Sequence, residues 1–203
     1  WAVLKFFAQN KIGVEKFSSL IVKSYIHYRE DTSQVLLNLL SSHDIPRFYE
    51  YCDNKEQLKL AILFLLTYPG IPMVYYGDEF GLKGGKDPDN RRCMPWGKEE
   101  NYDIFNFYKK LINLRKKESP LHRGNFKIIL QDEVNNIMAF RRKFKNKTAY
   151  IVLNNSHILQ NIEIDIEHSG NYRELINEDV VESNNSSLQV TLEPYQGKIF
   201  THP

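Results

Sequence analysis

Residues 35–47 read Val35-Leu-Leu-Asn-Leu-Leu-Ser-Ser-His-Asp-Ile-Pro-Arg47, an apolar run that stops at a histidine and a carboxylate. The run is short and is interrupted only by Asn38, which predicts a strand buried on both faces, as in a parallel sheet. Chemistry in parallel α/β folds collects at the carboxyl ends of strands, so His43 and Asp44 are the first candidates for function. The structural alternative is that Asp44 caps the N-terminus of a following helix, with Pro46 near its first turn.

A second strand follows the first through a helix. Residues 55–68 are rich in Leu and Ile and are followed by Pro69-Gly70, which predicts a helix that is covered on most sides. Residues 71–76 predict another short strand, which ends in the polar cluster 77–79. Strand, helix and strand together predict a βαβ unit of a parallel sheet.

The segments around this unit predict helices and one long loop. Residues 1–30 have the apolar spacing of two helices separated by a turn near residues 10–13. Residues 81–96 lack periodicity and predict a loop of a length that is usually functional. A helix is expected from Asp103, as its N-cap, to about residue 118.

Beyond residue 121 the apolar period changes from helical to two. Alternating or apolar segments predict short strands at residues 126–130, 137–144, 148–153, 162–166 and 188–192. The expected fold class is therefore α/β followed by all-β, with a small antiparallel β-sandwich at the end of the chain. We place the domain boundary near Pro120, giving domains 1–120 and 121–203, and expect the second to fold on its own.

Composition excludes several classes of partner. The formal net charge is +2, from 27 basic and 25 acidic residues, which gives no electrostatic case for nucleic acid or an anionic membrane. We find no apolar span of membrane length. Cys52 and Cys93 are too few for a disulfide framework or a zinc site, and they favour a reducing, cytoplasmic compartment. No cofactor and no metal ligand set is expected.

Three segments, taken in order, resemble the α-amylase family of glycoside hydrolases. They are Leu37-Asn-Leu-Leu-Ser-Ser-His-Asp44, Tyr68-Pro-Gly-Ile-Pro-Met-Val-Tyr-Tyr-Gly-Asp-Glu79 and Asp87-Pro-Asp-Asn-Arg-Arg92. The third looks most like the neopullulanase and cyclomaltodextrinase branch. The resemblance covers almost the whole chain and implies the last two βα units of a (β/α)8 TIM-type barrel, followed by a C-terminal β-domain.

The resemblance also implies roles for four residues. Asp44 matches the family's third catalytic carboxylate, which stabilises the transition state, and His43 matches its substrate-binding histidine. A carboxylate suits that task because hydrogen bonds to sugar hydroxyls strengthen in the oxocarbenium-like transition state. Asp87 and Arg91 resemble a pair that binds a sugar on the non-reducing side. Their structural alternative is a surface salt bridge that braces a loop.

For other polar and aromatic residues near these motifs, the roles that we expect are less specific. Asp78 and Glu79 are adjacent at a strand end and should point apart, which favours a structural role over acid/base work. Tyr76 and Trp96 could stack on sugar rings, but packing is the default expectation for a lone aromatic side chain. Cys93 stands where relatives often have proline.

Two groups that a retaining glycosidase needs are missing from these 203 residues. The family carries its nucleophile and general acid in motifs of the form Asp-x-x-Arg-x-Asp and Glu-x-Trp, and neither occurs here. We therefore expect a C-terminal piece of an enzyme that hydrolyses α-glucosidic bonds in maltodextrin, cyclodextrin or pullulan-type substrates. Its expected partners are that α-glucan and the missing N-terminal part of the barrel, and a homo-oligomer is left open. The alternative is a non-catalytic carbohydrate-binding or assembly module.

Overall fold

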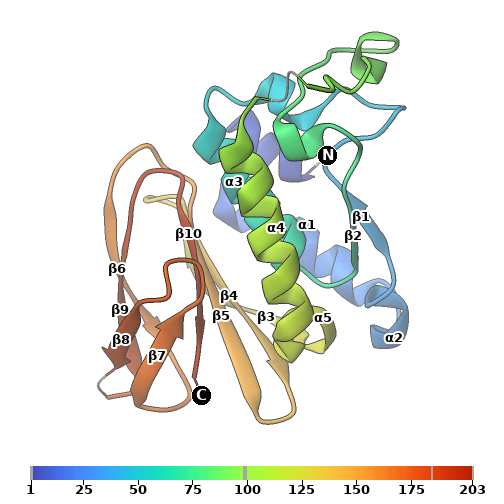
Figure 1. The fold of residues 1–203 in the computed structure, drawn as a ribbon. Coiled ribbons are helices and arrows are strands. Elements are labelled where there is room, and N and C mark those ends of the chain that lie inside the picture. Colours follow the sequence, from blue (N-terminus) through green and yellow to red (C-terminus); the bar gives the residue numbers. More distant parts are fainter. Residues whose placement is uncertain (1, 98–99, 184, 203) are drawn as a thin grey trace.

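The computed structural model describes residues 2–97, 100–183 and 185–202, in which a helical part with one pair of parallel strands is followed by an all-β part (Figure 1). The helices are η1 Leu4–Ala8, α1 Val14–Ile26, α2 Glu30–Ser33, η2 Phe48–Tyr51, α3 Lys55–Thr67, η3 Asp78–Phe80, η4 Asp89–Arg91, α4 Tyr102–Lys117 and α5 Ser119–Arg123. The strands are β1 Leu37–Leu39, β2 Ile71–Met73, β3 Asn125–Asp132, β4 Ile137–Phe144, β5 Lys147–Asn154, β6 Gln160–Asp165, β7 Gly170–Glu174, β8 Val180–Ser183, β9 Ser187–Leu192 and β10 Gly197–Thr201.

The predicted βαβ unit is present. Strands β1 and β2 pair in parallel, with Leu37 opposite Ile71, and α3 connects them. Helix α3 begins after Asn54, whose side chain accepts a hydrogen bond from the Gln57 amide at 2.9 Å. This cap satisfies one of the amides that a helix start leaves free, which explains why the helix begins there.

The prediction that residues 35–40 form a strand buried on both faces is wrong for this chain. Val35, Leu37 and Ile71 are 61%, 59% and 48% exposed. In the described residues β1 and β2 form a two-stranded sheet, so each strand has one neighbour and both faces of the pair are only partly covered. The second strand is also shorter than expected and ends at Met73.

The all-β part is antiparallel, as expected, and has two layers. Six strands form one sheet in the order β3-β4-β5-β10-β7-β8, and β6 pairs with β9 to form the other. Between them lies an apolar cluster that includes Tyr150, Val152, Leu188 and Val190. The alternation of apolar and polar residues in β9 places its apolar side chains in this layer.

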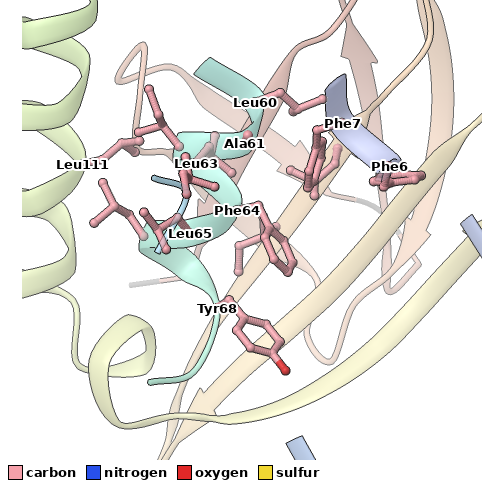
Figure 2. Close-up of a cluster of buried hydrophobic side chains, with 14 of the residues drawn as sticks. Phe6, Phe7, Leu60, Ala61, Leu63, Phe64, Leu65, Tyr68 and Leu111 are labelled. Carbon is pink, nitrogen blue, oxygen red and sulfur yellow. The ribbon is translucent and has the colours of Figure 1, made fainter. Parts of the chain in front are cut away.

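The second face of the six-stranded sheet packs against the helical part. Figure 2 shows Phe64 of α3 and Tyr68, which follows the helix, on the side away from Leu111 of α4. The Phe64 ring lies 6.1 Å from that of Phe140 in β4. A single apolar cluster therefore runs from α4 through α3 into the sheet, so the β-domain shares its core with the helices. The boundary near Pro120 stays a prediction.

The start of α4 also differs from expectation. Asp103 was expected to be its N-cap, but α4 begins at Tyr102 after Asn101, which has a positive φ of 58°. Asp103 lies within the first turn and forms ion pairs with Lys59 at 3.0 Å and Lys55 at 3.4 Å. Its carboxylate therefore joins α4 to α3. The turn before the helix is made by Asn101, and asparagine adopts left-handed backbone angles more readily than most residues.

Candidate functional site

His43 and Asp44 lie on a turn that follows the carboxyl end of β1. His43 Nε2 lies 3.2 Å from Asp44 Oδ1, and the two side chains are 62% and 73% exposed. The N-cap interpretation of Asp44 is wrong, because η2 begins only at Phe48 and the Phe48 amide donates to Ser41 Oγ at 3.0 Å. An exposed carboxylate beside an imidazole can bind neighbouring hydroxyl groups from solvent.

Asp87 and Arg91 lie on the loop that follows η3. Arg91 Nε is 2.8 Å from Asp87 Oδ1, and both side chains are about half exposed. Next to this pair, Asp89 accepts hydrogen bonds from the Gly85 amide at 2.6 Å and from Arg92 Nε at 2.7 Å. These two bonds lower the pKa of Asp89, the Gly85 amide first. The loop is thus held in shape by its own polar side chains.

Asn90 connects this loop to the His43–Asp44 turn. Its side chain is fully buried, and Nδ2 lies 3.2 Å from the Ser42 carbonyl and 2.9 Å from those of His43 and Ile45. Since Asn90 stands between Asp87 and Arg91 in sequence, these bonds bring both candidate pairs to the same end of the β1–β2 pair. In Figure 1 the turn and the loop lie together at the top of the view.

A buried ion pair supports both the His43–Asp44 turn and the loop that carries Asp87 and Arg91. Arg47 is fully buried, and its Nη1 donates to Asp78 Oδ1 at 3.0 Å and to the Tyr76 carbonyl at 2.7 Å. The guanidinium also lies over the rings of Tyr75 and Tyr76, at 4.6 and 4.9 Å from their centres. Burial raises the pKa of Asp78 to about 6, although Ser41 and Arg47 pull it down. Asp78 therefore has the structural role expected from the sequence.

The aromatic and thiol side chains of this region have different environments. Tyr76 is 40% exposed, and its hydroxyl donates to the Arg92 carbonyl at 2.8 Å. Trp96 is 78% exposed, so the default expectation of packing is wrong for that residue. Cys52 is buried, which raises the pKa of its thiol to about 12, whereas Cys93 is exposed and free.

Sequence reasoning gave no role to Arg47 or Asn90. Both stand within the quoted motifs, but what each contacts depends on how two distant loops pack. In the described ranges, no three His, Cys, Asp or Glu side chains are grouped so that they could hold a metal ion. The helices within the same ranges include none that is long and apolar enough to cross a membrane.

Comparison with known proteins assigns both parts of the chain. Residues 3–103 match the family model described as "Alpha amylase, catalytic domain", and residues 126–199 match "Maltogenic Amylase, C-terminal domain". Neopullulanase 2 of Thermoactinomyces vulgaris is 39% identical over 98% of this chain and 34% of the relative. A cyclomaltodextrinase of Thermoanaerobacter pseudethanolicus is 41% identical over 76% of this chain and 27% of the relative.

A solved structure extends the similarity to the fold. A cyclomaltodextrinase structure superimposes with a TM-score of 0.92 and 32% identity, covering 99% of this chain and 35% of that one. The agreement includes the helical part and the β-domain, since nearly every residue is matched. The chain spans about a third of the length of neopullulanase 2, the relative that matches 98% of this chain.

Proposed function

Because this chain belongs to the α-amylase family, we propose that the protein containing it is a retaining glycosidase that hydrolyses α-glucosidic bonds. The proposed substrates are maltodextrin, cyclodextrin or pullulan-type α-glucans, in keeping with relatives named neopullulanase and cyclomaltodextrinase. In a retaining enzyme two carboxyl groups about 5 Å apart act as nucleophile and general acid. We propose that both lie on the part of the barrel that precedes this chain.

The chain itself would supply transition-state binding. We assign Asp44 to accept hydrogen bonds from sugar hydroxyls, and His43 to donate one to the same ring. Positive charge develops on the sugar ring in the oxocarbenium-like state, which strengthens hydrogen bonds from its hydroxyls to a carboxylate. Asp87 and Arg91 are proposed to bind a sugar unit further along the chain, on the non-reducing side.

The observation that supports this assignment best is the exposure of Asp44 at the end of a parallel strand. Its side chain is 73% exposed, faces His43 and does not cap the helix that follows. A carboxylate in that position is accessible to a ligand and contributes little to folding. The ion pair of Asp87 and Arg91, about half exposed, is also accessible, on a loop of fixed shape.

The test is the substitution Asp44→Asn in the full-length protein, assayed on maltoheptaose and β-cyclodextrin. Losing one charged hydrogen-bonding partner costs about 1.5 to 3 kcal/mol, and two such bonds cost about twice that. We therefore expect kcat to fall by about 10² to 10⁴, with a much smaller change in KM. The unfolding midpoint should stay within about 1 °C of the wild type, because the side chain is exposed.

Glu163→Gln is the control, since Glu163 is exposed on β6 in the all-β part. It removes one carboxylate charge and should leave kcat unchanged. A destabilised but active Asp44→Asn protein would remove Asp44 from the site. A wild-type protein that binds maltoheptaose without cleaving it would favour the carbohydrate-binding alternative.

A further inference from the structure

The turn that carries His43 and Asp44 has little support from its own side chains. Both are mostly exposed, and within the turn the Asp44 amide bonds Ser42 Oγ at 3.1 Å. The carbonyls that flank Asp44 point instead toward a buried side chain from another loop, Asn90. Its Nδ2 meets the carbonyls of Ser42, His43 and Ile45 within 3.2 Å.

The chemistry of this contact is specific for an amide nitrogen. A carbonyl or carboxylate oxygen in the same place would face three carbonyl oxygens, whereas an amide nitrogen donates two hydrogens that three acceptors can share. This geometry also fixes the orientation of the Asn90 amide, because the flipped form would bring four oxygens together. Position 90 therefore requires a hydrogen-bond donor on a side chain as long as that of asparagine.

The loop is also bonded back to the turn through the main chain. The Arg47 amide donates to the Gly84 carbonyl at 2.9 Å, and Arg47 Nε donates to the Asn90 carbonyl at 3.0 Å. At Gly84 a side chain would meet the Asp89 carbonyl oxygen at 2.6 Å, so the loop passes closely over itself there. Asn90 is thus fixed at both its side chain and its main chain.

We propose that Asn90 is a positioning residue, which sets the backbone of the 42–45 turn so that Asp44 and His43 meet the substrate. The inference rests on the proposed function, since it gives Asn90 the task of orienting those two residues. A misplacement of about 1 Å at a reacting centre costs about 100-fold in rate. Asn90 also couples the turn to the loop that carries Asp87 and Arg91.

The test uses Asn90→Leu in the full-length protein, alone and combined with Asp44→Asn. Leucine keeps the number and branching of the side-chain heavy atoms, although it is bulkier, and it donates no hydrogen bond. We expect kcat to fall about 10- to 100-fold, in line with a misplaced turn. If Asn90 acts through Asp44, the same substitution should cost less than about threefold in the Asp44→Asn background, because the two effects are then not additive. A merely structural role would give effects that multiply.

A matched control comes from the same loop. The Lys86 side chain is exposed on that loop, so Lys86→Gln should change kcat by no more than about twofold. Asn90→Asp is a second variant in case Asn90→Leu does not fold. A carboxyl group donates one hydrogen bond when protonated and none when ionised, so its deficit in kcat relative to wild type should grow as the pH rises.

Hydrogen exchange supplies a readout that does not need activity. The amides of Asp44 and Arg47 should exchange about tenfold faster in Asn90→Leu than in wild type or Lys86→Gln, as expected for a locally released turn. Unchanged exchange, unchanged kcat or effects that multiply would each overturn the inference. An inactive wild-type protein would overturn the proposed function instead, and faster exchange would then still establish that Asn90 holds the turn.

Discussion

Two aspartates near the carboxyl ends of β1 and β2 have opposite environments, which determine what each can do. Asp44 is mostly exposed and its carboxylate meets His43, whereas Asp78 is 8% exposed and paired with Arg47. Burial raises the pKa of Asp78 to about 6, because the ionised form loses its hydration. A group that binds substrate must be reachable from solvent. Asp44 is therefore suited to binding, whereas Asp78 is suited to holding Arg47 in place.

We predict that Asp78 makes the protein less stable as the pH rises from about 4 to about 7. Its pKa is about 6 in the folded chain, against an ordinary value of 3.8, so the folded state holds a proton that the unfolded chain has released. Stability falls with rising pH wherever the folded state binds more protons. A shift of about two pKa units corresponds to about 3 kcal/mol across this window.

The measurement is the free energy of unfolding in urea at several pH values, for wild type and for Asp78→Asn, which cannot titrate. Relative to the variant, the wild type should lose stability between about pH 4 and pH 7. Arg47, Glu79 and Tyr108 act on Asp78 or face it and are present in both proteins, so the comparison isolates the change at position 78. Glu163→Gln should show no such trend. A difference that stays constant with pH would contradict the prediction.

For individual residues, the sequence predicted where the candidate side chains lie better than it predicted which residues hold them there. His43 and Asp44 follow an apolar run, so their place at a strand end could be expected from local pattern alone. Arg47 and Asn90 could not, since a buried arginine and a buried amide depend on partners 31 and 45 residues away. The Trp96 expectation failed for a related reason, because the packing of a loop residue depends on its neighbours in space.

The carboxyl end of α3 is held by two buried arginines. A helix leaves its last carbonyls without partners, and a positive charge there is favourable. Arg115 of α4 and Arg142 of β4 supply the donors, and burial lowers the pKa of Arg142 to about 9, which leaves it charged at neutral pH. The carbonyls that accept are those of Leu66, Thr67, Tyr68, Gly70 and Gly124. Both halves of the chain are thereby joined at one helix end.

We predict that Arg142→Leu lowers the free energy of unfolding by about 2 to 4 kcal/mol. The substitution leaves the Thr67 carbonyl buried without a donor, which costs about 1 to 3 kcal/mol. The Gly124 carbonyl keeps the bond from Gln34 Nε2 at 3.1 Å but loses those from Arg142, which adds about 1 kcal/mol. Removing a buried cation offsets part of that loss. Arg142→Lys should cost less stability than Arg142→Leu, because lysine keeps the charge. Some loss should remain, because one ammonium group cannot reach both carbonyls at once.

The measurement is urea unfolding of the three proteins, followed by circular dichroism. Arg173→Leu is the matched control, since Arg173 is exposed on β7, and it should change the free energy by no more than about 0.5 kcal/mol. Equal stability of wild type and Arg142→Leu would show that the arginine is not needed to hold the helix end.

Elements were easier to predict from the sequence than their lengths and burial. The period change near residue 121 and the breakers Pro69-Gly70 are local signals, and the βαβ unit and the antiparallel strands were confirmed. The burial of residues 35–40 was not confirmed, because burial of a strand depends on its neighbours, and among the described residues β1 pairs with β2 alone. Strand β2 contains Pro72, which cannot donate to a ladder and is tolerated on an edge strand.

Across the whole molecule, the six-stranded sheet lies between two apolar layers. One layer, with Tyr150 and Val152, is closed by β6 and β9, and the other, with Phe140 and Ile151, is closed by α3 and η1. A period of two predicts two faces for a strand but does not say what covers each face. The expectation that residues 121–203 fold by themselves therefore missed the shared core.

We predict that residues 121–203, produced alone, keep their strands but self-associate. Without the helices, the face with Met138, Phe140, Ile151 and Ile199 is uncovered, and contiguous apolar patches of that kind drive association. The isolated piece should bind ANS, as proteins with exposed apolar surface do. Its sedimentation should depend on concentration, while the β-sheet signal in circular dichroism persists.

The substitution Ile151→Lys tests the cause, because it should act in opposite directions in the two contexts. Ile151 is fully buried in β5, opposite Phe140 and Ile199 of its neighbouring strands. In the isolated piece the lysine faces water and reduces both ANS binding and association. In a protein that contains the helices, the same lysine is buried without a partner and should cost several kcal/mol of stability. Val180→Lys is the control, since Val180 is 67% exposed in β8 and the change should matter little in either context. A soluble, monomeric 121–203 that does not bind ANS would show that the β-domain needs no cover from α3.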